Sequence, residues 1–126
     1  MKVDSKVRID QRKIAALTAA AVTSLEQTAE ALHTEVVQAQ VVPRDKGTLQ
    51  GEAFTVDYSQ CKNGTATLVH STPYARRLYF HPEYNFQTEE NPNAKGKWFE
   101  DWTKGGKNDD FCEKAFKEFY RRNAGL

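Results

Sequence analysis

The sequence has 126 residues and a mass of 14.3 kDa, a size at which one domain with a modest hydrophobic core is expected. Eighteen Lys and Arg residues balance seventeen Asp and Glu residues, and a net charge of +1 gives no bulk field that would attract nucleic acid or an anionic membrane. The uncharged, alanine-rich stretch at residues 14–24 is too short to span a bilayer, and the first residues do not open a secretory signal. We therefore expect one domain, residues 1–126, that is cytosolic where it is made and recognises partners by shape and local patches.

The spacing of cysteine and histidine residues supports neither a metal site nor a disulfide. Cys61 and Cys112 lie far apart without C-x-x-C spacing, so two free thiols are expected. The three histidines are not closely spaced, and the glycine-containing turns lack the phosphate-binding G-x-x-x-x-G-K pattern. We expect no cofactor.

The N-terminal third predicts a short strand followed by a long helix. Residues 2–9 alternate between apolar and mostly charged side chains, and Asp10 is a suitable N-cap for a helix that continues to about Gln40. The apolar residues of this helix recur at helical spacing: Ile14, Leu17, Ala21, Leu25, Ala29, Leu32 and Val36. A helix of about 30 residues measures roughly 45 Å, whereas a compact domain of this size is roughly 35 Å across. We expect the helix to be broken or to project at one end.

An alanine cluster marks the first third of that helix: Ala15, Ala16, Ala19, Ala20 and Ala21. Such a smooth face lets another backbone lie close to the helix, which makes it a candidate interface. High intrinsic helix propensity explains the same cluster equally well, so both interpretations stay open.

A breaker cluster and a hairpin follow the helix. Pro43 excludes the helical conformation at the residue before it, and Asp45 and Gly47 are turn residues. Two runs rich in β-formers then flank Asn63-Gly64, the strongest short-range hairpin signal. The pattern predicts that residues 54–58 pair with residues 65–69 through a turn at this dipeptide.

Aromatic residues gather in the segment "TPYARRLYFHPEYNFQ", around two arginines. Tyr74, Leu78 and Tyr79 can form one face of a short helix that Pro82 ends. We expect Tyr74, Leu78 and Phe80 in the core, with the later aromatics of the segment more open. Stacking of single-stranded bases is an alternative role, which the neutral net charge disfavours.

The C-terminal part predicts two further helices. Asn91 and Pro92 resemble an N-cap and first helical residue of a helix that runs through Trp98, Phe99 and Trp102, with the two tryptophans as core or interface anchors. A last helix begins at about residues 108–110 and shows these residues on one face: Phe111, Ala115, Phe116, Phe119 and Tyr120. The expected fold class is α+β, with the long N-terminal helix and the C-terminal helices packed on a small antiparallel sheet that contains the central hairpin.

Candidate catalytic residues are few. His33 is expected to be a polar flank or a hydrogen-bonded core residue, and a dyad of Cys61 with His70 has no orienting third group. His81 with Arg76 or Arg77 forms the one grouping suited to a small enzyme or toxin that processes nucleic acid.

The elements are, in order, the long helix, "VPRDKGTL", the hairpin, "TPYARRLYF", "NPNAKGKWFEDW" and the terminal helix. The order of these elements resembles that of the minor capsid proteins of tailed bacteriophages, which are related to head-tail joining and tail completion proteins. The resemblance covers roughly residues 36–120. Related families usually show P-x-D-T-G-x-L, and Lys46 stands at the threonine position, while Pro43, Asp45, Gly47 and Leu49 match. A turn that depends on a threonine hydroxyl is therefore not expected here.

The resemblance implies an α+β fold and a non-enzymatic subunit of a ring between portal and tail, found in the virion and assembled in the cytoplasm of the bacterial host. Its partners would be further copies of itself and neighbouring phage head, connector or tail proteins, with no membrane and no sequence-specific nucleic acid. A generic adaptor for one partner chain is a further possibility. The candidate interface residues are Ala15, Ala19, Arg44, Asp45, Lys46, Tyr84, Phe86 and Trp102.

Overall fold

The computed structural model describes residues 11–43, 54–71, 74–84, 86, 88 and 91–126, with side chains described from residue 17 onward. The strand expected at residues 2–9, the N-cap Asp10 and the turn at Asp45 and Gly47 lie outside these ranges. The elements in chain order are α1 (Gln11–Ala39), β1 (Phe54–Asp57), the 3-10 turn η1 (Cys61–Asn63), β2 (Thr67–His70), α2 (Ala75–Tyr79), the 3-10 turn η2 (Glu100–Trp102) and α3 (Phe111–Ala124).

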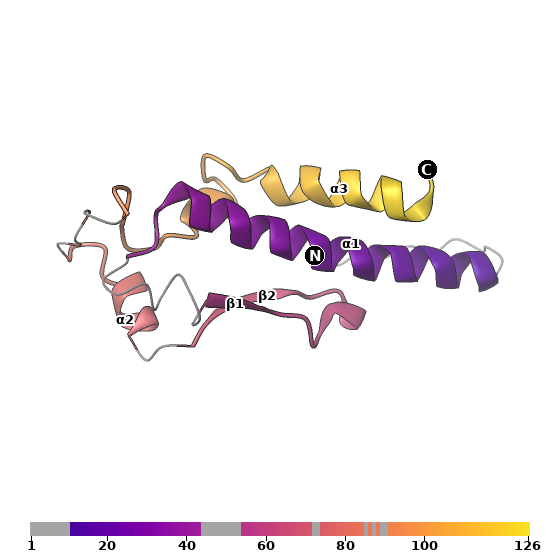
Figure 1. Cartoon of the computed structure of the whole chain (residues 1–126), viewed down its shortest axis with the longest axis horizontal. Coiled ribbons are helices and arrows are strands. Elements are labelled where there is room, and N and C mark those ends of the chain that lie inside the picture. Colours follow the sequence, from indigo (N-terminus) through magenta and orange to yellow (C-terminus); the bar gives the residue numbers. More distant parts are fainter. Residues whose placement is uncertain (1–10, 44–53, 72–73, 85, 87, 89–90) are drawn as a thin grey trace.

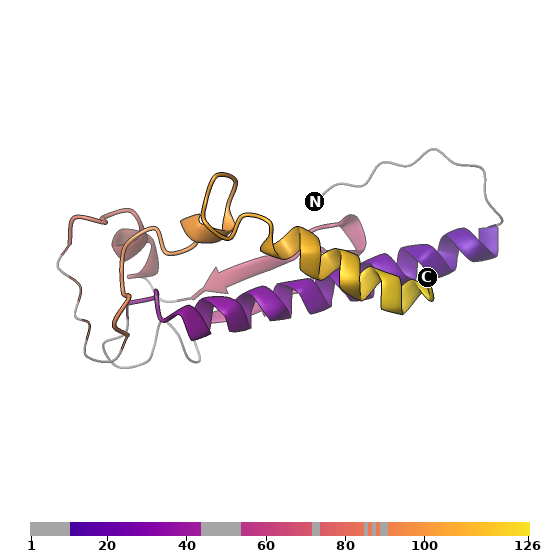
Figure 2. The ribbon, with the colours of Figure 1, turned by 90° about the horizontal axis from the view of Figure 1, so that it is seen from above.

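Helix α1 is the middle layer of the molecule, between α3 on one side and the hairpin of β1 and β2 on the other (Figure 1). Seen from above, α3 runs alongside α1 in the opposite direction (Figure 2). The α+β class is confirmed. The two strands form one antiparallel sheet, and α3 packs on α1 rather than directly on that sheet.

Helix α1 is continuous and outreaches its neighbours. Its 29 residues correspond to about 43 Å, whereas the 14 residues of α3 correspond to about 21 Å. The N-terminal turns of α1 therefore extend past the end of α3 (Figure 1). Of the two alternatives that the sequence left open, projection of one end is confirmed. Among the described residues, no helix is both long and apolar enough to cross a bilayer.

Side chains from a distant segment cap the end of α1. Gln40 takes a left-handed conformation with φ of 56°, which ends the helix three residues before the proline. Asn93 Nδ2 then donates to the carbonyl oxygen of Ala39 at 2.9 Å, and buried Asn91 Nδ2 donates to that of Val42 at 2.7 Å. The helix predicted to start at Asn91 and Pro92 is therefore wrong: the Asn93 amide satisfies a carbonyl group that α1 leaves unpaired, and the Asn91 amide binds the segment that follows α1. Between Asn91 and the start of α3, the only helical element is the 3-10 turn η2.

The hairpin is confirmed, but its turn and register differ from the prediction. Phe54 pairs with His70 and Asp57 with Thr67, so the strands are joined by residues 58–66 and not by a two-residue turn. Gly64 does adopt a positive φ of 88°, and its N–H donates to the carbonyl oxygen of Cys61 at 3.0 Å. Here the Asn-Gly dipeptide closes η1 instead of linking the strands directly, which shifts the paired residues toward the base of the hairpin.

The core lies at the C-terminal end of α1. Phe54 is sandwiched between the rings of His33 and His70, with ring centroids 4.3 Å away on each side. Trp98 is fully buried and donates from Nε1 to His70 Nε2 at 3.0 Å. The remaining buried members of this cluster are Val36, Val41, Val42, Ala75 and Trp102. The tryptophans are thus core anchors, whereas the prediction that Tyr74 and Phe80 are core residues is wrong, since 68% and 59% of their surface is exposed.

Helix α3 forms close to its predicted position and lies along α1. Phe111, at its start, packs against the aromatic core, and Asn123, near its end, donates to Ser24 Oγ and Gln27 Oε1 of α1 at 3.0 and 2.7 Å. The side facing away from α1 carries ion pairs between residues four apart, which are typical of a solvent-facing helix surface: Lys114 with Asp110, Lys117 with Glu113, and Arg122 with Glu118.

Candidate functional site: a groove on helix α1 and a corner at helix α2

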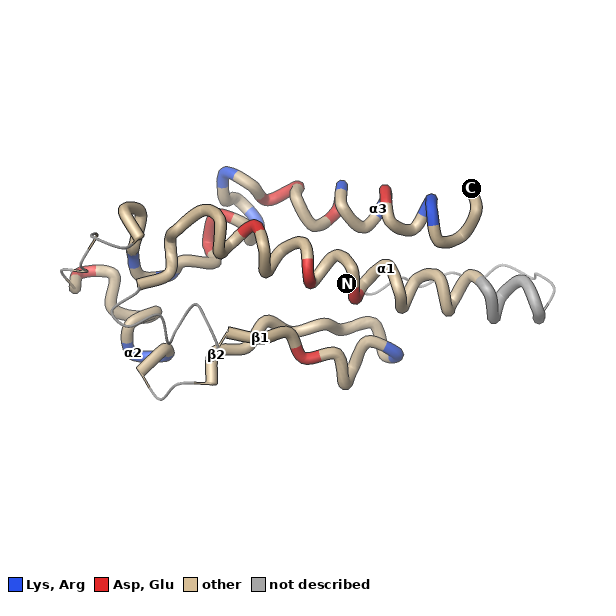
Figure 3. The backbone as a smooth tube through the Cα atoms, viewed as in Figure 1, with Lys and Arg blue, Asp and Glu red and all other residues tan. Residues whose placement is uncertain are grey.

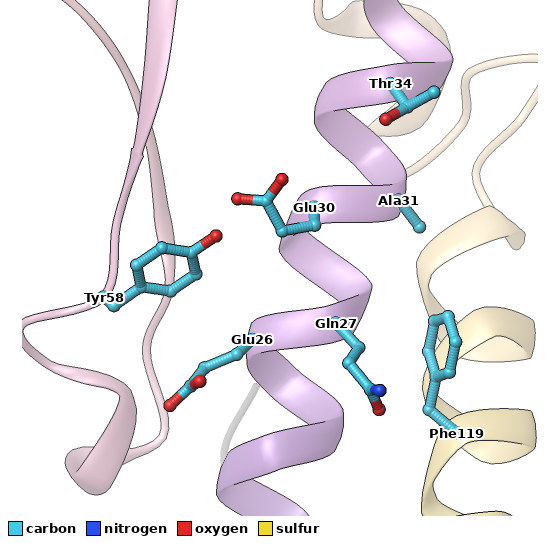
Figure 4. A pocket seen from close by; sticks show the side chains of 7 residues that line it. All are labelled: Glu26, Gln27, Glu30, Ala31, Thr34, Tyr58 and Phe119. Carbon is cyan, nitrogen blue, oxygen red and sulfur yellow. The ribbon is translucent and has the colours of Figure 1, made fainter.

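An open groove of about 440 Å³ lies on the face of α1 that α3 and the hairpin leave uncovered. Its floor is α1 itself, with Tyr58 of the hairpin connection on one side and Phe119 of α3 on the other (Figure 4). The tyrosine ring points toward Glu30, and Phe119 lies beside Gln27 (Figure 4). The lining residues are Glu26, Gln27, Glu30, Ala31, Thr34, Tyr58 and Phe119. We call this feature the α1 groove.

The α1 groove is acidic. Between residues 17 and 39 the helix carries three glutamates and no Lys or Arg, and Figure 3 shows them spaced along it. Glu26 and Glu30 are one turn apart, and within the described ranges neither forms an ion pair. Like charges at this spacing destabilise a helix by about 0.2–0.5 kcal/mol. The groove therefore has an electrostatic cost that a cation from elsewhere would relieve.

The negative charge near the groove also affects the pKa of the buried Cys61 thiol. Cys61 lies in η1, three residues after the groove residue Tyr58. Burial raises the pKa of this thiol first, and the negative charges of Glu26 and Asp57 raise it further. Two carboxylates from different elements thus act on one atom, so the negative field of the groove extends from α1 onto the hairpin connection.

A second exposed feature stands at α2, which we call the α2 corner: Tyr74, Arg76, Arg77, Phe80, His81 and Tyr84. Arg76 and Phe80 are one helical turn apart, and the Phe80 N–H donates to the carbonyl oxygen of Arg76 at 3.1 Å. The side chains of both are exposed, and Arg76 has no ion pair among the described residues. The corner therefore presents a cation next to a large apolar ring.

The other side chains of the α2 corner hold one another in place. Arg77 Nε donates to the Tyr84 hydroxyl at 3.2 Å, and the His81 ring stacks on Tyr84 with centroids 4.7 Å apart. His81 Nδ1 donates to Glu83 Oε1 at 2.7 Å, and this hydrogen bond lowers the pKa of the Glu83 carboxyl. All of these groups are partly or fully open to solvent, so this surface is preorganised without being closed off from water.

The structure brings few of the predicted interface residues together. Ala19 is exposed on α1, the backbone of Ala15 lies on the same helix, and Trp102 is only 8% exposed in the core, which corrects its assignment to the surface. Tyr84 and Phe86 are half-buried neighbours at the α2 corner, with centroids 6.4 Å apart. The remaining three lie outside the described residues: Arg44, Asp45 and Lys46.

The histidines and cysteines outside the corner serve the packing. His33 Nε2 donates to the carbonyl oxygen of Phe54 at 2.9 Å, which confirms it as a hydrogen-bonded histidine at the core. His70 pairs with Phe54 at one end of the hairpin, whereas Cys61 lies beyond its other end, so the two do not form a dyad. Within the described part of the chain, no group of three or more His, Cys, Asp or Glu side chains is placed to hold a metal ion.

The groove residues Glu26, Glu30 and Tyr58 were missed by the sequence-based search for a site. The available signal was the pair of glutamates four residues apart in a helix segment without a basic residue. The contributions of Tyr58 and Phe119 depend on how three elements pack and left no such signal.

No protein-family model matches this chain, and no curated protein and no solved structure matches it either.

Proposed function

We propose that the protein is a structural, non-enzymatic subunit of the neck of a tailed bacteriophage, within a head-tail connector or tail completion ring. The resemblance of the motif order to minor capsid proteins suggests this role. One structural observation carries it: α1, at about 43 Å, extends beyond the elements that cover it. A helix that outreaches its own domain offers surface that neighbouring subunits can bury.

In a ring, two different surfaces of each subunit meet the two neighbouring copies. A ring subunit must present two different surfaces, because head-to-tail contacts alone generate a closed cycle. The α1 groove and the α2 corner are two such surfaces, and further contacts with neighbouring phage head, connector or tail proteins fall on what the ring leaves uncovered. The protein would then act in the virion, after assembly in the cytoplasm of the bacterial host.

Electron microscopy of the purified chain tests this function. Negative-stain images of the full chain at increasing concentration should show closed rings of uniform diameter, in equilibrium with monomer. A chain that stays monomeric at every concentration, or that forms only twofold dimers, would contradict a ring subunit.

The His81–Glu83 hydrogen bond supports an alternative function, that of a small enzyme that processes nucleic acid. Glu83 orients the His81 ring, and Arg77 is linked to it through Tyr84, an arrangement that general acid-base catalysis on a phosphate could use. Incubation of the purified chain with RNA and with DNA decides this. Cleavage that is lost in His81→Ala and weakened in Glu83→Gln would establish the enzyme; intact substrates with the wild-type chain would reject it.

A further inference from the structure

We propose that the α1 groove binds the α2 corner of a second copy of this chain, with Arg76 placed between Glu26 and Glu30. The inference rests on the proposed ring function and specifies its contact. It assigns a partner to two exposed features that face no other element within the described part of the chain.

The groove offers what an arginine requires. Glu26 and Glu30 lie one turn apart on an open helix face, and no Lys, Arg or His of the described residues pairs with them. A guanidinium has five N–H donors in a planar fork, which suits two neighbouring carboxylates better than an ammonium does. An incoming arginine would replace like-charge repulsion on α1 with two attractive contacts.

The corner supplies a matching pair of groups. Arg76 is followed one turn later by Phe80, whose surface is 59% exposed. In the groove, Glu26 and Glu30 point toward the hairpin side of α1, and Ala31 and Phe119 offer apolar surface on the α3 side (Figure 4). The two surfaces are thus complementary. The cation of the corner can meet the glutamates of the groove while the ring of Phe80 meets its apolar side chains. Arg77 is held by Tyr84, which leaves Arg76 as the cation of α2 available for this contact.

The contact has to form between two copies. Tyr58 follows β1 at the end of the hairpin where Asp57 pairs with Thr67, whereas α2 follows β2 at the opposite end. The groove and the corner of one chain therefore lie apart along the molecule and cannot bind each other (Figure 1). Because the two surfaces differ, each bound copy still presents a free groove or a free corner, so the contact can repeat and closes into a ring where the rotation between copies permits it.

A charge-swap experiment on the full chain tests the contact. The variants are Glu30→Lys, Arg76→Glu and the double variant, with Glu113→Lys as a matched control outside the groove lining. Each single variant should raise the concentration needed for ring formation by about tenfold or more, because like charges then meet in the interface. The double variant should regain part of the lost ring formation, since positions 30 and 76 again carry opposite charges while Glu26 still repels the new carboxylate. The control should assemble as the wild type does.

Circular dichroism and a thermal melt of each variant show that it is folded, as expected for exposed positions. Rings that form at the wild-type concentration in both single variants would overturn the groove contact and leave the ring function standing, with the groove then belonging to another protein. Single variants that fail with no recovery in the double variant would overturn the pairing of Arg76 with Glu30. A wild-type chain that never self-associates would overturn the contact and the ring function together.

Discussion

The two ends of α1 are packed in different ways. At its C-terminal end large rings and β-branched side chains fill the core, with Trp98 and Val36 fully buried. Further toward its N-terminus the buried side chains are small: Ala20, Ser24, Thr28 and Ala29. There Ser24 Oγ and Thr28 Oγ1 donate to carbonyl oxygens one turn earlier, at 2.6 and 2.7 Å, and Asn123 of α3 reaches across.

The two kinds of packing have different roles: the large side chains stabilise the fold, and the small ones let the two helices approach each other. Buried aromatic and branched side chains remove large apolar surfaces from water, and that term scales with area. Small side chains remove little surface but let α3 approach α1 closely along a row of residues four apart. We therefore expect the aromatic end to set the free energy of unfolding, and the α1–α3 contact to open at lower cost.

The largest expected effect comes from removing the centre of the aromatic end. Trp98→Ala should lower the free energy of unfolding by about 3–5 kcal/mol, because it deletes a fully buried ring and leaves a cavity. Urea denaturation measures the change. Tyr74→Ala, at an exposed aromatic, is the control and should stay within about 0.5 kcal/mol of wild type. Equal losses in the two variants would mean that stability is not concentrated in this cluster.

A second comparison tests the hydrogen bonds of the two tryptophans in the aromatic cluster. Trp98 Nε1 donates to His70 Nε2, whereas buried Trp102 Nε1 has no hydrogen-bond partner within the described residues. Trp98→Phe should therefore cost about 1–3 kcal/mol, since it removes a donor from a partly buried acceptor. Trp102→Phe removes an unpaired N–H and should cost less. Denaturant midpoints of the two variants give the order, and the reverse order would contradict it.

At the other end, Asn123→Ala should have a small effect on global stability. The amide donates to Ser24 and Gln27 at a solvent-facing position, so its loss should cost at most about 1 kcal/mol. Hydrogen exchange should nevertheless become faster in the last turns of α3, while amides near Trp98 keep their rates. Uniformly faster exchange would show that the two ends unfold as one unit.

The smallest effect concerns Cys61 and tests the field of the groove. Glu26→Gln removes one of the negative charges that raise the pKa of the thiol, so that pKa should fall and alkylation of Cys61 at mildly alkaline pH should become faster. The raised pKa also makes stability depend on pH. Its stabilising contribution is fully present below the ordinary value of 9.0 and is lost as pH rises through the folded-state value. An unchanged alkylation rate in Glu26→Gln would contradict the electrostatic contact.

Local patterns in the sequence were sufficient for the elements whose stability is local. The apolar stripe of α1, the acidic start and aromatic face of α3, and the β-rich runs around Asn63-Gly64 each predicted an element that forms. The register of a hairpin depends on the residues that connect its strands. Because these form the 3-10 turn at Cys61, the observed register differs from the predicted one.

The errors arose where long-range contacts decide the structure. Asn91 has the sequence context of an N-cap, yet its amide caps a carbonyl group 49 positions away, at Val42. Tyr74 and Phe80 belong to an aromatic-rich segment but lie at the exposed ends of a one-turn helix. The α1 groove draws on α1, the hairpin connection and α3, so no single window of sequence contains it.

The position of the two tryptophans also determines what an optical experiment on this protein can detect. The chain has two tryptophans, and both lie in the cluster at the C-terminal end of α1. Their emission will follow the loss of that cluster and will not register separation of α3 from the N-terminal part of α1. Far-ultraviolet circular dichroism follows both helices along their whole length. A gap between the two melting curves would therefore show that helical structure in α3 or the N-terminal part of α1 is lost before the aromatic cluster unfolds.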